Sequence, residues 1–158
     1  MKLEIPGVAM SFDEVPVGAF FRFERTKPEF GICVTDGTKR AAIILSTTER
    51  PNGHLPWLAL GGLPSDAVVS FPGAVLRASH TDISDDTGIY GYLISTGGSF
   101  YIRVGVSGGY HTFSVETGQS AQLPKAKMAI AYSKWAVGIM VDERFEPIFS
   151  FPPSQDPT

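Results

Sequence analysis

The sequence contains very little cysteine, which limits both its chemistry and its expected compartment. Cys33 is the single cysteine among 158 residues, so no disulfide can form within the chain. This pattern lacks the mark of oxidative export, and Pro6 and Gly7 interrupt any apolar signal segment. We therefore expect a cytoplasmic protein, with a phage or virion protein as the alternative. Because Cys33 lies between Ile32 and Val34, we interpret it as a small packed residue rather than a nucleophile.

Long apolar runs and basic runs are also absent. No apolar stretch approaches the roughly 20 residues that span a bilayer as a helix, so we expect no membrane insertion. The formal net charge is −3, and runs of lysine and arginine do not exceed two residues. Binding to nucleic acid needs a concentrated basic surface, so nucleic acid is not an expected partner.

Catalytic and metal-binding motifs are missing as well. His54, His80 and His111 are far apart in the chain and do not show the short spacing typical of zinc ligands. The SxxK motif does not occur, and the GxSxG match at residues 105–109 falls in a predicted turn that no helix follows, so we do not interpret Ser107 as a nucleophile. The acidic residues 82–88 resemble a calcium loop, but glycine and glutamate are not placed as an EF-hand requires. We expect no metal, no cofactor and no catalytic residue; an irregular oxygen site in the acidic loop is the alternative.

What the sequence does have is glycine, proline and short alternating segments. Its 17 glycines and 12 prolines suit many short elements joined by turns. The hydrophobic fraction is 43% and the charged fraction 18%, values typical of a folded globular chain. The length fits a single domain over residues 1–158 that can build its own core. Since no segment shows a clear helical period, we predict an all-β fold, a compact antiparallel β-barrel or β-sandwich.

Residues 99–118 carry the clearest pattern and predict a β-hairpin. Apolar residues at the even positions of 100–106 alternate with polar ones, which is the mark of a half-buried strand. Residues 107–109, with two glycines, then supply a turn, and residues 110–115 return. The side chains expected in the core share one face of this hairpin: Ile102, Val104, Phe113 and Val115.

Other short segments with strand periodicity are separated by turn signals. They cover residues 17–23, 30–35, 40–47, 67–71, 74–78, 89–95, 127–132, 135–141 and 148–151. The segments expected to lack strands are an irregular lead-in at 1–15, a long loop at 48–64 and an acidic surface loop at 79–88. In the strand predicted at 89–95, Tyr90, Tyr92 and Ile94 share one face.

A faint internal repeat runs through the chain. The segments GAFFRF, FGICVTDG, AAIILSTTE and AVVSF resemble GYLIST, SFYIRVGVSGG, HTFSVETG and MAIAY, in that order. The first three pairs are offset by about 70 to 73 positions and the last by about 61. The repeat suggests two small barrel-like halves, residues 15–80 and 88–151, related by weak duplication.

The polar face of the predicted hairpin is the candidate site for a partner. Tyr101 and Arg103 lie on its first arm, and Tyr110 and Thr112 on its second. Tyrosine and arginine are enriched where proteins contact partners, and aromatic faces can stack on sugar rings. Trp57, in the 48–64 loop, is a further candidate. Cross-strand pairing that only stabilises the sheet is the alternative explanation for these residues.

We therefore expect a non-catalytic all-β module that recognises a protein partner or assembles with its own copies as a homo-oligomer. A carbohydrate-binding module that uses the tyrosine face is the first alternative. The second is a small β-barrel enzyme with its site under the 48–64 loop, since long loops often cover functional sites.

Overall fold

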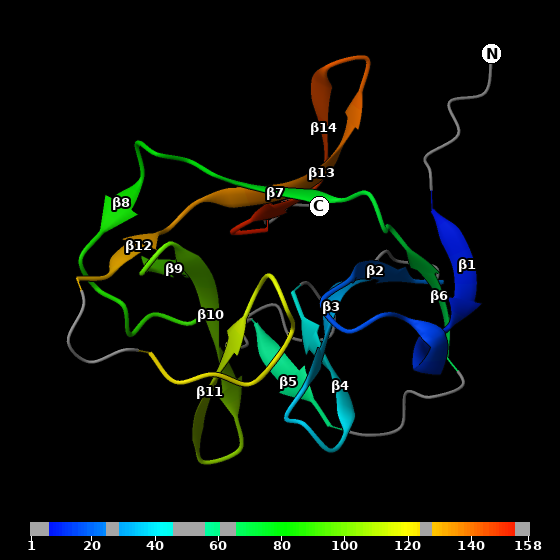
Figure 1. Cartoon of the computed structure of the whole chain (residues 1–158), viewed down its shortest axis with the longest axis horizontal. Helices are drawn as coiled ribbons and strands as arrows, with labels where there is room; N and C mark the ends of the chain where they lie inside the picture. The colour runs from blue at the N-terminus through cyan, green and yellow to red at the C-terminus, as the bar shows by residue number, and fades with distance from the viewer. Residues whose placement is uncertain (1–6, 25–28, 46–55, 61–65, 124–127, 154–158) are drawn as a thin grey trace, which may run out of the picture.

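The computed structural model describes the chain except for residues 1–6, 25–28, 46–55, 61–65, 124–127 and 154–158. The fold is all-β with two sheets, as predicted, and Figure 1 shows its course. In the described part, the helical structure is one 3₁₀ turn, η1 (Phe12–Glu14). The larger sheet has the order β1 (Val8–Ser11), β6 (Ala67–Ser70), β2 (Phe20–Phe23), β3 (Glu29–Thr35), β4 (Arg40–Ile44), β5 (Trp57–Ala59), β10 (Ser99–Val106), β9 (Leu93–Thr96), β12 (Ile130–Tyr132) and β8 (Ile83–Ser84), with β11 (Gly109–Ser114) also beside β10. The smaller sheet has the order β14 (Arg144–Phe151), β13 (Trp135–Val141) and β7 (Val75–Ala78).

The predicted central hairpin is confirmed as β10 and β11. Val106 pairs with Gly109, which leaves a two-residue turn in which Gly108 has a φ of 82°; glycine adopts this angle without a steric penalty. The side chains of three predicted core residues are buried: Ile102, Val104 and Phe113. Val115 is only half-buried, so its predicted full burial is wrong. It follows the end of β11 and borders a cavity that is described below.

Three segments that we expected to lack strands contain one. The lead-in at 1–15 forms β1 and η1, because β1 pairs with β6 and the Phe12 N–H donates to the Asp66 carbonyl oxygen at 2.9 Å. The long loop at 48–64 contains β5, and the acidic loop at 79–88 contains the short strand β8. The remainder of the long loop lies largely outside the described residues.

The strand predicted at 89–95 begins later than expected. β9 starts at Leu93, because Gly91 has a φ of 86° and takes part in a turn. Tyr90 and Tyr92 therefore precede the strand, and their predicted alternation along it is wrong.

Apolar side chains pack against both faces of the larger sheet. Between the two sheets lies the main core, whose largest members include Phe20, Ile43, Leu93, Ile102, Phe113, Trp135 and Phe149. A second core lies on the opposite face, where the lead-in covers the first strands; it includes Phe12, Val15, Phe21, Phe23, Cys33 and Ile44. Burial of each large apolar side chain contributes about 1.5–3 kcal/mol.

The strand pairing of residues 8–78 recurs in residues 83–141, and we refer to these as the first half and the second half. The first half pairs its strands in the order β1, β6, β2, β3, β4, β5. In the second half the order is β8, β12, β9, β10, β11, followed by residues 119–121, which bridge to β11. Each neighbouring pair in both series is antiparallel.

The register of these pairs is also the same in the two halves. Phe20 pairs with Ile32 between β2 and β3, and Leu93 pairs with Ile102 between β9 and β10. The other matching pairs are Ile32–Ile43 with Ile102–Phe113, Phe21–Ser70 with Ile94–Ala131, and Ile43–Leu58 with Phe113–Ser120. Positions that match in this way are called equivalent below.

The two halves also contact each other at equivalent positions. Gly105 on β10 pairs in parallel with Trp57 of the first half. Its equivalent, Thr35 on β3, pairs in parallel with Gln119 of the second half. The last segment in the pairing order of each half, β5 or residues 119–121, therefore lies against the fourth strand in the order of the other half, β10 or β3.

Candidate binding surface

The polar face of the β10–β11 hairpin brings together an arginine and an exposed aromatic ring. Gly105 pairs with Tyr110, and Arg103 pairs with Thr112, so these residues share one face. The Arg103 guanidinium carbon lies 4.5 Å from the centroid of the Tyr110 ring. The Tyr110 residue is 57% exposed. A cation–π contact at such a site contributes about 0.5–1 kcal/mol, which is enough to hold the two side chains in a preferred arrangement.

Trp57 and Tyr90 extend this arrangement. Trp57 pairs with Gly105, so its half-buried side chain projects on the same face of the sheet. A Cβ added at Gly105 would lie 3.3 Å from the Tyr90 ring, and the Tyr90 hydroxyl donates to the Gly109 carbonyl oxygen at 3.2 Å. The absence of a side chain at Gly105 therefore lets Tyr90 lie against β10.

We define the hairpin surface as Trp57, Tyr90, Tyr101, Arg103 and Tyr110. The sequence pattern predicts each of these residues except Tyr90 as a binding candidate. The signal that could have found it is Gly105, since a glycine inside an alternating strand often marks the close approach of another group.

Not every predicted site residue lies on this surface. Thr112 is only 6% exposed. Its strand β11 has a partner on each side: β10, and residues 119–121, where the Ala121 N–H donates to the Thr112 carbonyl oxygen at 2.9 Å. Tyr101 is half-buried. Among the described residues, the buried Nε of Arg103 has no hydrogen-bond partner, so the guanidinium is positioned by its ring contact and not by a carboxylate.

Of the two described histidines, His111 contacts other residues of the protein through its side chain. His111 Nε2 lies 2.7 Å from Ser120 Oγ, and its ring stacks on Phe113 at 4.7 Å. The Ser120 contact fastens β11 to residues 119–121. His80 is exposed in the acidic loop, and His54 lies outside the described residues. In the described part of the chain, no group of three or more His, Cys, Asp or Glu could hold a metal ion.

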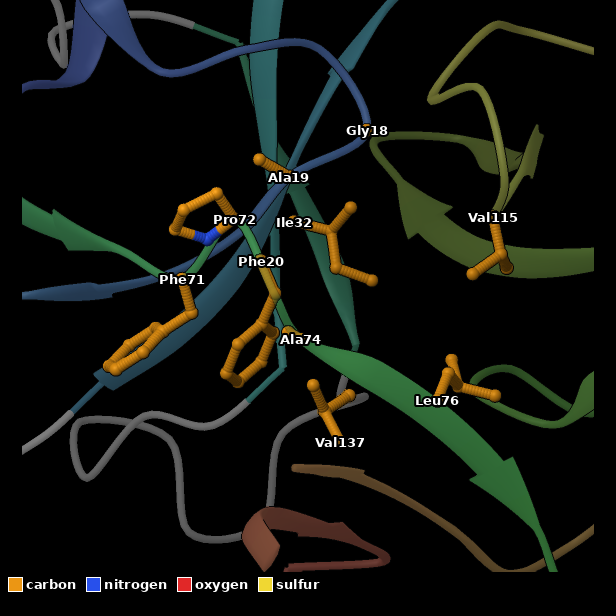
Figure 2. Close-up of a pocket in the computed structure, with 10 residues that line it drawn as sticks. All are labelled: Gly18, Ala19, Phe20, Ile32, Phe71, Pro72, Ala74, Leu76, Val115 and Val137. Carbon is orange, nitrogen blue, oxygen red and sulfur yellow. The ribbon is translucent and has the colours of Figure 1, made fainter. Parts of the chain in front are cut away.

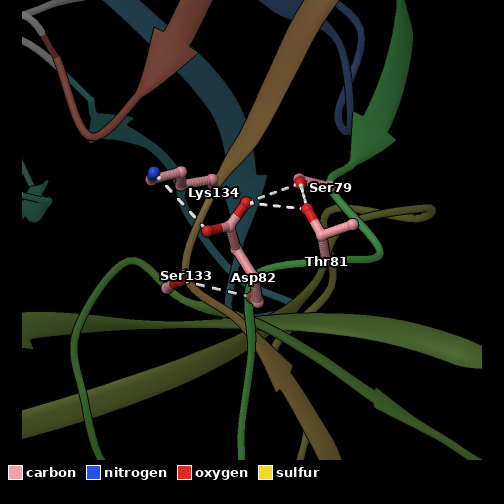
Figure 3. A network of polar contacts seen from close by, with 5 residues as sticks. All are labelled: Ser79, Thr81, Asp82, Ser133 and Lys134. Carbon is pink, nitrogen blue, oxygen red and sulfur yellow. Dashed lines mark hydrogen bonds and ion pairs between the residues drawn. The ribbon is translucent and has the colours of Figure 1, made fainter.

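Asp82 anchors the acidic loop to the segment that follows β12, as Figure 3 shows. Ser79 Oγ donates to its carboxylate at 2.7 Å, and Lys134 Nζ lies 3.5 Å from its other oxygen. The Ser79 hydrogen bond, followed by the charge of Lys134, lowers the pKa of Asp82. The Ser133 N–H donates to the Asp82 carbonyl oxygen at 3.0 Å. This network explains the position of Asp82 through contacts within the protein alone.

The predicted packing of Cys33 is confirmed. Its side chain is buried in the second core, and Sγ donates to the Val15 carbonyl oxygen at 3.6 Å. Burial raises the pKa of the Cys33 thiol to about 11. Because the thiolate is the nucleophilic form, this raised pKa favours the less nucleophilic thiol of Cys33 at neutral pH.

An apolar cavity lies between the larger sheet and β7, beside Gly18, and we call it the Gly18 cavity (Figure 2). Its volume is about 140 Å³. Its lining consists of glycine, alanine, proline, valine, leucine, isoleucine and phenylalanine residues. General acid–base catalysis uses a titratable side chain, and none occurs among the described residues that line this cavity.

In the described part of the chain, no helix has the length and apolar character needed to cross a membrane. Comparison of the chain with protein-family models, with curated proteins and with solved structures found no match.

Proposed function

We propose that this chain is a duplicated, non-catalytic β-barrel module that recognises a protein partner, its own copies included, through the hairpin surface. The barrel would be a closed ring of β3, β4, β5, β10, β11 and residues 119–121. Two parallel pairs between the halves, Gly105–Trp57 and Thr35–Gln119, support the closure of this ring, because they join the halves at the two places where they meet.

Equivalent glycines support the duplication. Gly18 precedes β2, and Gly91 precedes the equivalent strand β9; their φ values are 92° and 86°. The Gly18 N–H donates to the Cys33 carbonyl oxygen at 2.7 Å, and the Gly91 N–H donates to the equivalent Arg103 carbonyl oxygen at 2.9 Å. Two unrelated strand groups would have no reason to share these details of register and turn geometry.

The single observation that carries the proposed function is the contact of Arg103 with Tyr110, whose ring is exposed. In the first half, the position equivalent to Tyr110 is Arg40, whose guanidinium donates to the Asp13 carbonyl oxygen at 2.6 Å and to that of Val15. Arg40 thus fastens the lead-in over the first half. In the second half, the same position presents an exposed tyrosine whose ring is already paired with a cation.

The composition of the hairpin surface favours a protein over a carbohydrate. Arginine, tyrosine and tryptophan are the residues most enriched at the energetic centres of protein interfaces. Stacking on a sugar needs an open aromatic face, whereas Arg103 occupies one face of Tyr110. Trp57 and Tyr101 are half-buried and offer only part of their rings.

Light scattering over a range of protein concentrations tests whether the partner is a second copy. If it is, the mass should rise above 17.0 kDa with concentration, and the double variant Tyr101→Ser/Tyr110→Ser should stay monomeric. A matched control is Phe145→Ser, because Arg77 lies 4.6 Å from the Phe145 ring on the smaller sheet. This variant should assemble as the unmodified protein does.

A constant monomeric mass would direct the test to other proteins. Peptides would then be selected from a displayed library on the unmodified protein, with the double variant used for counter-selection. Peptides that bind the unmodified protein and Phe145→Ser, but not the double variant, would support the proposal. If no such peptide is found and a glycan array is positive, the carbohydrate alternative replaces it.

A further inference from the structure

The Gly18 cavity has a counterpart in the second half that is filled. Gly91 is equivalent to Gly18, as shown above. Tyr132 pairs with Leu93, while the Phe71 N–H donates to the carbonyl oxygen of Phe20, the residue equivalent to Leu93. Phe71 and Tyr132 are therefore equivalent, and three residues beyond them stand Ala74 and Trp135.

The Trp135 indole occupies the space beside Gly91. Trp135 is 3% exposed, and its Nε1–H donates to the Gly91 carbonyl oxygen at 2.8 Å. Phe151 stacks on the indole with a centroid distance of 5.3 Å and an interplanar angle of 14°. The second half thus contains a built site for an aromatic ring, with one hydrogen bond that orients it.

The first half keeps the walls of this site without the ring. Ala74 ends at its Cβ, and it lines the Gly18 cavity together with Phe20, Ile32, Leu76 and Val115 (Figure 2). The strand β14, which supplies Phe151, follows the second half. The cavity is therefore the volume that the indole and its stacking partner fill in the other half.

We infer that the Gly18 cavity is a binding site for a small planar aromatic ligand of the indole class, with its N–H directed at the Gly18 carbonyl oxygen. The size is appropriate, since an apolar cavity of about 150 Å³ binds benzene, and this cavity, which is partly open to solvent, has a volume of about 140 Å³. The apolar lining supplies the contact area, and the carbonyl supplies orientation. The inference rests on the equivalence of the two halves and does not depend on a protein partner at the hairpin surface.

Titration of the protein with indole, followed by methyl NMR, tests this site. The methyl signals of Ile32, Leu76 and Val115 should shift and saturate together. Ala74→Trp places in the first half the residue that fills the second, and it should weaken indole binding at least tenfold. The control Val75→Trp adds the same ring at a neighbouring residue that is 38% exposed, and it should bind indole as the unmodified protein does.

Further probes separate the parts of the inference. If Ala74→Trp does not fold, the smaller Ala74→Leu should still weaken binding. Indene, which has the shape of indole without the N–H, should bind about 2- to 10-fold more weakly because one neutral hydrogen bond is lost. Binding of N-acetyltryptophanamide would identify a polypeptide tryptophan as a source of the ring, and its exclusion would leave free indole-type compounds.

Two results would overturn the inference. One is the absence of methyl shifts in the unmodified protein at saturating indole. The other is indole binding that Ala74→Trp and Ala74→Leu both leave unchanged, since the ligand would then occupy a different place. Equal affinities for indole and indene would remove the hydrogen bond from the account.

Discussion

The outer faces of the two halves carry different residues on the same pattern of strands. In the first half, Cys33 and Ile44 belong to an apolar core that Phe12 of the lead-in covers. The equivalent positions of the second half hold Arg103 and Ser114. One arrangement of strands thus serves packing in one half and presents an arginine and an exposed tyrosine in the other. The difference depends on the side chains and not on the backbone.

The faces that point into the main core also differ between the halves, in how the space beside the equivalent glycines is filled. The second half fills the space beside Gly91 with Trp135 and Phe151, whereas the first half leaves a cavity beside Gly18. Close-packed interiors contain few voids larger than a water molecule. The cavity at one of two equivalent positions therefore marks a place where the packing of the halves differs.

The largest expected effect is a loss of stability when a charge replaces a buried valine that the two halves share. Val34 and Val104 are equivalent and fully buried, so Val34→Asp and Val104→Asp should each bury an unpaired charge and destabilise the fold by more than about 4 kcal/mol. Urea unfolding measures this loss. The surface control Val75→Asp should stay within about 0.5 kcal/mol of the unmodified protein. A stable Val104→Asp variant would show that the assigned register is wrong.

Trp135→Ala should make the second half resemble the first. Removal of the indole should cost about 3–5 kcal/mol and open a cavity beside Gly91. Indole added to this variant should raise the melting temperature by more than it raises that of the unmodified protein, because two sites are then available. A melting temperature that indole does not change would argue against the equivalence of Trp135 and Ala74.

Loss of the Phe12 ring, through which the lead-in packs on the second core, should reduce the stability of the first half alone. The Phe12 ring lies 5.4 Å from that of Phe21 in the second core, and Phe12→Ala should destabilise the protein by about 3 kcal/mol. Partner binding per folded molecule should not change. If instead Phe12→Ala proved as stable as the unmodified protein, the lead-in would not be a structural cover.

The smallest expected effect concerns the turns. Hydrogen bonds from the Lys39 and Thr38 N–H groups lower the pKa of Asp36, in the β3–β4 turn, from 3.8 to about 2. A carboxylate with a lowered pKa stabilises the fold above its unfolded pKa of about 4, and this contribution is lost as the pH falls towards 2.

The stability difference between the unmodified protein and Asp36→Ala should therefore be constant above about pH 5 and shrink between about pH 4 and 2. Thermal melts over this pH range measure it. Ser107→Ala, in the turn of the second half, is the control and should show no such trend. A difference that grows on acidification would contradict the assigned hydrogen bonds.

Local patterns predicted the elements that are regular over several residues. The alternation along 99–106 and the glycines that follow predicted the β10–β11 hairpin, and the apolar segment at 135–141 predicted β13 with its correct ends. β5 and β8 were not predicted because two or three residues show no periodicity. They form strands only because a partner strand is already present at β4, β10 or β12.

Long-range contacts determine which candidate residues are buried or exposed, and the local sequence pattern could not predict this. The alternation placed Thr112 correctly on the polar face, but only the fold shows that Thr112 is buried and that residues 119–121 pair beside it. Tyr90 reaches the hairpin surface because a turn at Gly91 precedes β9. The Gly18 cavity depends on the difference between Ala74 and Trp135, and that difference has meaning only when the two residues are known to be equivalent.

The central claim is that the hairpin surface of the second half serves recognition and not packing. The most direct test compares Tyr101→Ser/Tyr110→Ser with the unmodified protein in one experiment that measures both melting temperature and binding to its own copies or to a selected peptide. We expect a nearly unchanged melting temperature and at least a tenfold loss of binding. A large drop in melting temperature, with binding per folded molecule unchanged, would contradict the claim and assign these tyrosines to the core.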